Sequence, residues 1–260
     1  MLHGMPGHMQ KARLAIAKYA KVLDCYLLVL DSRAPDSTWD SRLAARFQHK
    51  LVVVLNRAAL ANPEQTGRWV EHFTRAGFTA LAVDAKAGTG MGKLRAVLES
   101  KAKGKKPLHV AVTGLPNTGK STILNSLLGR KASKVENRPG VTRGPQWVKV
   151  GNLVILDTPG VLTASSDLKS PILAALGIVA SDSEPTASWL VARLLSRSSG
   201  ALACFGLASP PEPGQELSAI AEKQGWLRRG AQPDYARTSQ GVLAAFQSGK
   251  MGRWTLEEIR

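Results

Sequence analysis

The chain has 260 residues, 44% of them hydrophobic and 21% charged, which is the composition of an ordinary globular protein. Two cysteines are too few for a four-cysteine zinc module, and no apolar run reaches the length of about 18 residues that a membrane span requires. The formal net charge of +16 favours a polyanionic partner, nucleic acid before an anionic membrane, although some basic proteins are simply basic. Because basic residues interrupt the apolar residues of the N-terminus, we expect no signal peptide and a compartment that is a bacterial cytoplasm or an organelle matrix.

The first part of the chain alternates apolar strands with amphipathic helices. Strands are expected at 26–30, 51–55 and 80–83, and helices at 10–23, 38–47, 63–76 and 90–98. The helix at 63–76 has a favourable start, because Asn62 can cap it and Pro63 suits its first position. Continuous apolar strands that alternate with helices indicate a parallel sheet covered on both faces. A basic connector at 101–107 then interrupts the pattern.

Residues 114–121, GLPNTGKS, match the phosphate-loop pattern G-x-x-x-x-G-K-[ST], with an apolar strand before them and a helix after them. Gly114 and Gly119 let the backbone turn its N–H groups toward phosphate oxygens. Lys120 can reach the β and γ phosphates of a nucleotide, and the Ser121 hydroxyl can hold Mg²⁺. The alternative is a glycine-rich turn beside a surface lysine. The residues expected to bind nucleotide here are Asn117, Thr118, Gly119, Lys120, Ser121 and Thr122.

A β-hairpin is expected from 146–150 and 153–156, with Gly151 and Asn152 as its turn. The hairpin ends at Asp157-Thr158-Pro159-Gly160, where Asp157 can hold Mg²⁺ through water and the Gly160 N–H can meet the γ phosphate. Between the phosphate loop and the hairpin, Thr142 is the candidate that completes Mg²⁺ coordination and acts in catalysis. The alternative is that Thr142 is an ordinary loop residue.

Beyond about residue 165 the pattern becomes helical, with helices expected at 173–179, 186–195, 217–224 and 240–247. We therefore expect two domains, a nucleotide-binding domain at 1–175 and an all-α domain at 176–260 that binds RNA. Single basic side chains are more often solvated than bound to phosphate. The candidates for an RNA-facing surface are Lys101, Lys103, Lys105, Lys106, Arg193, Arg197, Arg228, Arg229, Arg237, Lys250 and Arg253.

The order of the motifs is unusual for a GTPase. The base-reading element N-K-x-D ordinarily follows the phosphate loop, whereas here the candidate, Asn56-Arg57-Ala58-Ala59, precedes it. Asp84-Ala85-Lys86 resembles the S-A-K loop, whose backbone N–H meets guanine. The fold class expected is therefore α/β, a P-loop GTPase sheet with circularly permuted motif order, followed by a small all-α domain.

That order, together with Pro6-Gly7-His8-Met9, Asp31-Ser32-Arg33-Ala34-Pro35 and the closing segment at 246–253, resembles the YlqF/RbgA family of circularly permuted GTPases of ribosome assembly. The resemblance covers nearly the whole chain. It implies GTP and Mg²⁺ as cofactors and a monomer that acts on the large ribosomal subunit precursor and its rRNA. It also implies hydrolysis that is slow alone and stimulated by the ribosomal particle.

The resemblance implies two further roles. Asn117 matches the residue that holds K⁺ in potassium-stimulated relatives, and its alternative role is to shape the turn. Val161 stands where many GTPases have a water-positioning glutamine, so the resemblance implies that His8 positions or deprotonates the water. The alternative is that His8 is only a histidine of an N-terminal arm.

The main departure from the family pattern is Ala59, which occupies the position of the aspartate in N-K-x-D. That aspartate accepts two N–H bonds from guanine, so its loss is expected to cost roughly tenfold to several hundredfold in preference for GTP. Asn56 and the Ala85 N–H remain, and Arg57 can stack along the base. Two alternatives stay open, an RNA-binding factor that senses nucleotide with little hydrolysis and an ATPase or nucleotide binder of relaxed base choice.

Overall fold

The computed structural model describes residues 19–102, 107–129, 133–134, 146–157 and 170–259. Most of the helix expected at 10–23 therefore lies outside the described residues. The chain divides into two compact units, unit 1 with Met1–Ser166 and Glu257–Arg260, and unit 2 with Asp167–Leu256. Within the described ranges, no helix combines the length and the apolar character that crossing a membrane would need.

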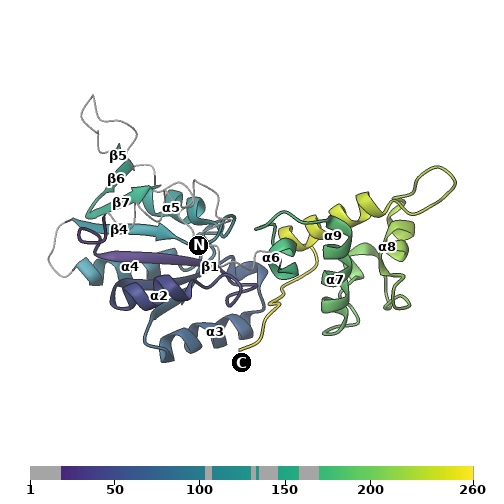
Figure 1. Cartoon of the computed structure of the whole chain (residues 1–260), viewed down its shortest axis with the longest axis horizontal. Helices are drawn as coiled ribbons and strands as arrows, with labels where there is room; N and C mark the ends of the chain where they lie inside the picture. The colour runs from purple at the N-terminus through teal and green to yellow at the C-terminus, as the bar shows by residue number, and fades with distance from the viewer. Residues whose placement is uncertain (1–18, 103–106, 130–132, 135–145, 158–169, 260) are drawn as a thin grey trace, which may run out of the picture. The chain divides into compact units, whose positions relative to one another are not determined.

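Unit 1 is built on one sheet, in which the seven described strands have the order β3-β2-β1-β4-β7-β6-β5 (Figure 1). The pairs from β3 to β7 are parallel, and the pairs of β6 with β7 and with β5 are antiparallel. All residues of β1 and β2 are buried, as expected for strands covered on both faces. The strands are β1 (Cys25–Asp31), β2 (Leu51–Asn56), β3 (Thr79–Ala82), β4 (Leu108–Thr113), β5 (Ser133–Lys134), β6 (Gln146–Val150) and β7 (Leu153–Asp157).

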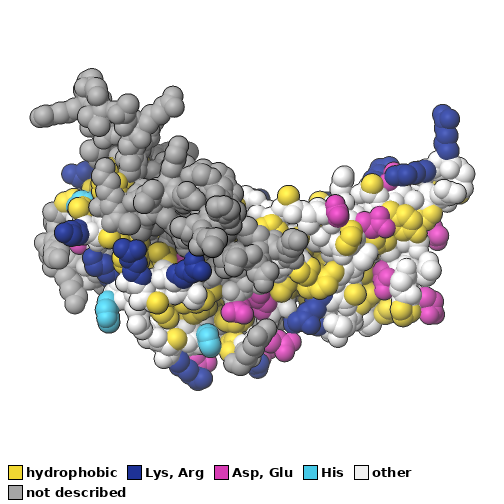
Figure 2. Space-filling model, viewed as in Figure 1, with side chains coloured by type: hydrophobic (Ala, Val, Ile, Leu, Met, Phe, Trp, Pro, Cys, Tyr) yellow, Lys and Arg dark blue, Asp and Glu magenta, His cyan; other side chains and the backbone are white. Residues whose placement is uncertain are grey.

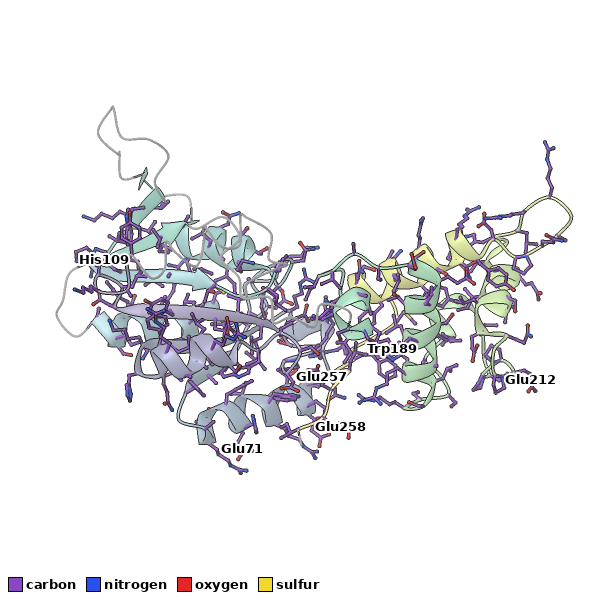
Figure 3. All side chains as sticks on the ribbon, viewed as in Figure 1. Glu71, His109, Trp189, Glu212, Glu257 and Glu258 are labelled. Atoms are coloured by element: carbon purple, nitrogen blue, oxygen red, sulfur yellow. The ribbon has the colours of Figure 1, made fainter. Side chains whose placement is uncertain are left out.

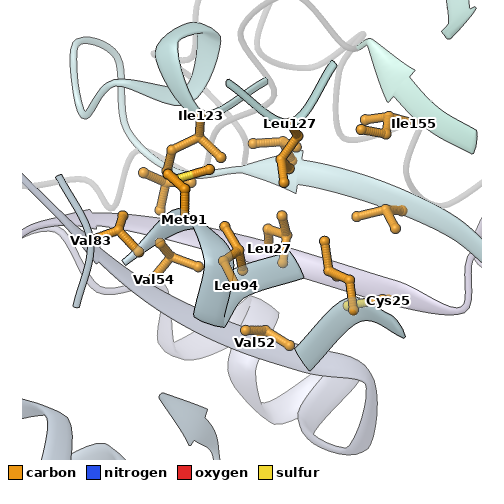
Figure 4. Close-up of a cluster of buried hydrophobic side chains, with 14 of the residues drawn as sticks. Cys25, Leu27, Val52, Val54, Val83, Met91, Leu94, Ile123, Leu127 and Ile155 are labelled. Atoms are coloured by element: carbon orange, nitrogen blue, oxygen red, sulfur yellow. The ribbon is translucent and has the colours of Figure 1, made fainter. Parts of the chain in front are cut away.

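Helices cover both faces of this sheet. The described helices of unit 1 are α2 (Ser41–Phe47), α3 (Pro63–Arg75), α4 (Met91–Ala102) and α5 (Lys120–Leu128), with short 3-10 turns η1 (Gln48–Lys50) and η2 (Ala58–Leu60). Leu94 of α4 and Ile123 and Leu127 of α5 belong to one buried cluster with β1, β2 and β4 (Figure 4). Residues of α2 and α3, among them Trp69 and Phe73, pack in a second cluster on the other face. The parallel sheet covered on both faces is therefore confirmed.

Local signals in the sequence account for several of these elements. The Asn62 side chain accepts a hydrogen bond from Gln65 N at 3.0 Å and caps α3, with Pro63 in the first position, as predicted. The hairpin of β6 and β7 is confirmed, and Gly151 in its turn has a φ of 55°. The helix expected at 38–47 begins only at Ser41, because Asp40 is its N-cap and accepts from Leu43 N.

Unit 2 is helical, as predicted. Its described helices are α6 (Pro171–Ala175), α7 (Ser183–Leu195), α8 (Glu216–Gln224) and α9 (Tyr235–Ser248), with the 3-10 turn η4 (Ala203–Phe205). The helix expected at 173–179 starts earlier, at Pro171, which suits the first turn of a helix. It also ends earlier, because Gly177 at a φ of 70° ends the turn that follows α6. Fully or nearly fully buried side chains of α7, α8 and α9 form the core, including Leu190, Ile220 and Phe246.

The last residues of the chain belong to unit 1, whereas we expected them to belong to the helical domain. Glu257 is labelled in Figure 3. Its carboxylate accepts hydrogen bonds from Asp36 N at 2.7 Å and from Ser37 N at 3.0 Å, and the Ser37 hydroxyl also donates to it. Ile259 packs against the cluster that contains Trp69 and Phe73. Unit 2 is therefore an insertion whose chain leaves unit 1 after β7 and returns to it at Glu257.

Candidate nucleotide-binding site

The phosphate loop joins the carboxyl end of β4 to the start of α5, as predicted. Gly114 has a φ of 134°, and a Cβ at this position would lie 2.2 Å from the Val29 carbonyl oxygen of β1. Gly119 has a φ of 91° and precedes Lys120, the first residue of α5. Asn117 also adopts the left-handed region, at a φ of 59°. The loop therefore curls in a conformation that only glycine can adopt at 114, and it opens at the start of a helix, where N–H groups can receive an anion.

Lys120 lies in this loop with its ammonium group turned onto the backbone. Its Nζ donates to the Leu115 carbonyl at 2.7 Å, and the Thr118 hydroxyl donates to the same carbonyl at 2.9 Å. Burial lowers the pKa of Lys120 to about 8. A partly buried ammonium favours an anionic partner, which a nucleotide phosphate supplies. The side chains of Ser121 and Thr122 are exposed at the start of α5, where a hydroxyl can hold Mg²⁺ beside a phosphate.

Asn56, at the carboxyl end of β2, connects the phosphate loop to the loops that follow β2 and β3. Its Nδ2 donates to the Thr118 carbonyl at 2.9 Å, and its Oδ1 accepts from Ala85 N at 3.1 Å. A Cβ on Gly119 would lie 2.2 Å from the same Nδ2. The residues of the early base-reading element and those of the later phosphate loop therefore meet at one edge of the sheet. This is the arrangement that the circularly permuted order predicts.

The two loops beside Asn56 carry the residues that were expected to contact the base. Arg57 has a φ of 60°, and its NH1 lies 3.4 Å from Oδ2 of Asp31. Burial lowers the pKa of Arg57, and the Asp31 carboxylate opposes that shift. The Ala85 N–H donates to Asn56, so guanine can use that N–H only by sharing it with the Asn56 side chain.

Asp84, one of the residues expected to bind the nucleotide, makes a contact with the loop after β2 that motif reasoning did not anticipate. Its side chain is nearly buried, and its Oδ2 accepts from the N–H of Ala59 at 3.3 Å while its Oδ1 accepts from Ala87 N at 2.9 Å. The sequence offered one signal for this contact. The loop after β2 lacks a carboxylate, because Ala59 stands at the usual aspartate position, and the loop after β3 has an additional one, Asp84.

Several candidate residues cannot be placed. His8, Thr142, Gly160 and Val161 lie outside the described residues. Asp157 ends β7, the neighbour of β4 in the sheet, so its backbone lies on the correct edge. Among the residues that the structure does describe, no group of three or more His, Cys, Asp or Glu could hold a metal ion.

Five of the six candidate RNA-facing arginines fall into two groups, and the sixth, Arg253, is exposed near the end of the chain. Arg193 of α7 and Arg197, just beyond the end of α7, donate to the carbonyls of Leu256 and Thr255, so they hold the end of unit 2 in place. Arg228 and Arg229 are exposed in the loop between α8 and α9, and Arg237 is exposed in the first turn of α9. Figure 2 shows basic side chains projecting at the end of unit 2 that carries this loop. Lys103, Lys105 and Lys106 lie outside the described ranges.

Comparisons with known proteins agree with this geometry. Residues 109–186 match the family described as 50S ribosome-binding GTPase. The ribosome biogenesis GTPase A of Priestia megaterium is 34% identical, over 97% of this chain and 95% of its own length. The protein of the same name from Bacillus cereus is 32% identical, over 99% of this chain and 94% of its own length. The crystal structure of GNP-bound YlqF from Thermotoga maritima superposes with a TM-score of 0.65, at 27% identity, covering 95% of this chain and 98% of that one.

Proposed function

Because the chain belongs to the ribosome biogenesis GTPase A family, we propose that it binds GTP at the junction of Asn56 and the phosphate loop and acts on the large ribosomal subunit precursor. The observation that supports this most directly is a pair of hydrogen bonds, in which Asn56 donates to the Thr118 carbonyl and accepts from Ala85 N. It brings the phosphate-side and base-side loops to one site. A nucleotide bound there would contact both sets of residues at once.

Each candidate residue has a role in this proposal. Lys120 neutralises the β and γ phosphates, Ser121 supplies a hydroxyl to Mg²⁺, and Arg57 lies along the base. We assign to His8 the positioning of the attacking water, and to Asn117 a K⁺ ion that adds positive charge near the phosphates. The residues proposed to hold nucleotide and metal are Asn56, Arg57, Asp84, Ala85, Asn117, Thr118, Gly119, Lys120, Ser121, Thr122, Thr142, Asp157 and Gly160.

The ribosomal partner is supported by charge. The chain carries 35 Lys and Arg against 19 Asp and Glu, and exposed arginines gather at the loop between α8 and α9. We propose that a monomer in the cytoplasm grips large-subunit rRNA through unit 2 while GTP is bound, and loosens that grip after hydrolysis. The segment after Asp157 would transmit the change, because it follows the candidate magnesium ligand and leads directly into unit 2.

Co-sedimentation with large ribosomal subunits at graded salt tests this proposal. We expect binding with a non-hydrolysable GTP analogue to exceed binding with GDP, and Lys120→Ala to abolish the difference. Replacing Arg228 and Arg229 together by Ser should lower the affinity for the subunit. It should also reduce the slope of log affinity against log salt concentration by about one to two. The matched control replaces Arg68 and Arg75, two exposed arginines of α3, with the same loss of charge. Equal effects of the two pairs would refute a specific role for the α8–α9 loop.

A second candidate function is a nucleotide-dependent RNA-binding factor with little hydrolysis. Val161 favours it, since a valine cannot orient water by hydrogen bonds. Single-turnover hydrolysis with and without ribosomal particles distinguishes the two functions. Stimulation by the particle that is lost in His8→Ala, with GTP affinity unchanged, would support catalysis assisted by His8.

A further inference from the structure

We propose that Asp84 supplies the carboxylate that recognises guanine, in place of the aspartate that position 59 lacks. In this chain the carboxylate is on the loop after β3, whereas the family pattern has it on the loop after β2. The N1–H and 2-amino groups of guanine would donate to it. This inference rests on the proposed binding of GTP at this site and adds the residue that selects the base.

The loops after β2 and β3 lie side by side and are joined by hydrogen bonds. The strands β2 and β3 are neighbours in the sheet, with Leu55 beside Ala82, so their following loops leave the sheet side by side. Ala58 N donates to the Val83 carbonyl at 3.1 Å, and Ala59 N donates to Oδ2 of Asp84 at 3.3 Å. A carboxylate oxygen of Asp84 therefore reaches the backbone of the residue from which the usual guanine-reading aspartate would extend.

The same loops are held against the phosphate loop. Asn56 bonds to Ala85, the residue after Asp84, and to Thr118 in the phosphate loop. A nucleotide whose phosphates occupy the phosphate loop therefore has its base directed toward the loops that carry Ala59 and Asp84. The distance between these two loops is fixed by side-chain and backbone hydrogen bonds, so the carboxylate is positioned before any ligand arrives.

Asp84 keeps the capacity to accept from a base. Its side chain is only 8% exposed, and the two described bonds use one lone pair on each oxygen. Each carboxylate oxygen can accept two hydrogen bonds, so one position on each oxygen is left for the two donors of guanine. Adenine presents an acceptor at N1 and no 2-amino group, so a carboxylate here would disfavour ATP.

A purely structural role for Asp84 makes a different prediction. The bond from Ala87 N to Oδ1 closes a turn over residues 84–87, and asparagine closes such a turn equally well. A residue that only shapes the turn would therefore tolerate Asp84→Asn without a change in base preference. A residue that reads the base would not, because the amide replaces one acceptor by a donor.

The experiment is competition of GTP, XTP and ATP against a fluorescent guanine nucleotide. In Asp84→Asn we expect GTP affinity to fall by about tenfold to a hundredfold, and XTP affinity to rise, because xanthine carries a carbonyl where guanine carries its 2-amino group. Glu71→Gln, an exposed change of equal charge on α3, is the control and should leave all three affinities unchanged. An unchanged ratio of GTP to XTP would overturn the proposal. If the parent protein bound no GTP at all, the proposed function itself would fail.

A second set of variants decides the question even if Asp84→Asn does not fold. Ala59→Asp alone should weaken GTP binding, because two carboxylates would then face each other. Ala59→Asp combined with Asp84→Ser should restore it, since the carboxylate returns to the loop after β2 and the like charge is removed. Tighter GTP binding by Ala59→Asp with Asp84 still present would show that Asp84 does not serve this purpose.

Discussion

The Asn56 side-chain amide donates to the Thr118 carbonyl at 2.9 Å, although 62 residues separate the two in the sequence. The same side chain accepts from Ala85 N at 3.1 Å, and it is only 2% exposed. Both contacts require an amide, because aspartate cannot donate and leucine can do neither. A single buried side chain therefore joins the ends of β2 and β3 to the phosphate loop.

Asn56→Ala should weaken GTP binding by about tenfold or more and lower the free energy of unfolding by about 1–3 kcal/mol, because it leaves two backbone groups without their partner. Fluorescent nucleotide titration and urea denaturation measure the two effects. Asn62→Ala is the control, since it removes the cap of α3 and should cost about 1 kcal/mol without any effect on affinity. Equal GTP affinity in Asn56→Ala and Asn62→Ala would show that the bridge does not organise the site.

The sequence predicts those parts of this fold whose signals are local. Apolar runs located β1 and β2, Asn62 and Pro63 located the start of α3, and the phosphate-loop pattern located a strand, a loop and a helix. The meeting of Asn56 with that loop was also predictable, because parallel strands end at the same edge of a sheet and each motif has a known ligand.

Other contacts between distant residues were beyond such reasoning. Glu257 bonds to Ser37 across 220 residues, and no periodicity in either segment indicates the pairing. Arg197 was one candidate for the RNA-facing surface, and it bonds to backbone carbonyls of unit 2. The contact of Asp84 with Ala59 depends on how the loops after β2 and β3 are placed relative to each other, which composition does not indicate. These contacts follow from tertiary packing alone.

Proton uptake should accompany nucleotide binding at Lys120. Burial lowers the pKa of Lys120 to about 8, so at pH 8 about half of the free protein carries a neutral amine, while a bound triphosphate favours the charged form. Calorimetric titration at pH 8 in two buffers of different ionisation enthalpy should therefore show uptake of about half a proton, falling to about 0.1 at pH 7. No uptake at any pH between 8 and 9.5 would mean that the phosphates do not reach Lys120.

The same shift gives a pH dependence of stability. The unfolded chain holds the Lys120 proton up to its ordinary pKa of 10.5, whereas the folded, nucleotide-free protein releases it near 8. Since the unfolded state binds more protons between these values, the contribution of Lys120 makes the free protein more stable as pH rises through that window. Saturation with GTP should flatten this slope, which thermal denaturation across pH 7.5–9.5 can measure.

Breaking the buried ion pair of Asp31 and Arg33 should be costly. Both side chains are fully buried, and the guanidinium binds the carboxylate through two bonds, Nε to Oδ1 at 2.9 Å and NH2 to Oδ2 at 2.8 Å. Arg33→Met should lower the free energy of unfolding by about 3–5 kcal/mol in urea denaturation, because it leaves the buried carboxylate with only the longer, partly exposed contact to Arg57 at 3.4 Å as an ion pair. Glu64→Gln is the control. Its pair with Arg68 has a similar length, 2.7 Å, but is exposed, so the change should stay below about 0.5 kcal/mol. Equal costs would show that burial does not determine the strength of these pairs.

Alanine variants of three glycines should distinguish effects on stability from effects on GTP affinity. A Cβ on Gly114 would meet the Val29 backbone oxygen at 2.2 Å, a Cβ on Gly119 would meet the Asn56 side chain at 2.2 Å, and a Cβ on Gly88 would meet nothing within 4 Å. All three have positive φ, so each alanine variant should carry a similar backbone strain of about 1–2 kcal/mol.

Gly114→Ala should add the cost of displacing strand backbone and lower stability by about 3 kcal/mol or more in urea denaturation. Gly119→Ala obstructs only the end of a side chain. It should therefore keep most of the stability but lose GTP affinity as Asn56→Ala does, because Asn56 must leave Thr118. Gly88→Ala, with open space, should show the common strain alone. If Gly119→Ala bound GTP as tightly as Gly88→Ala, the Asn56 amide would not need its place against the phosphate loop, and the reason for an asparagine at the end of β2 would have to lie elsewhere.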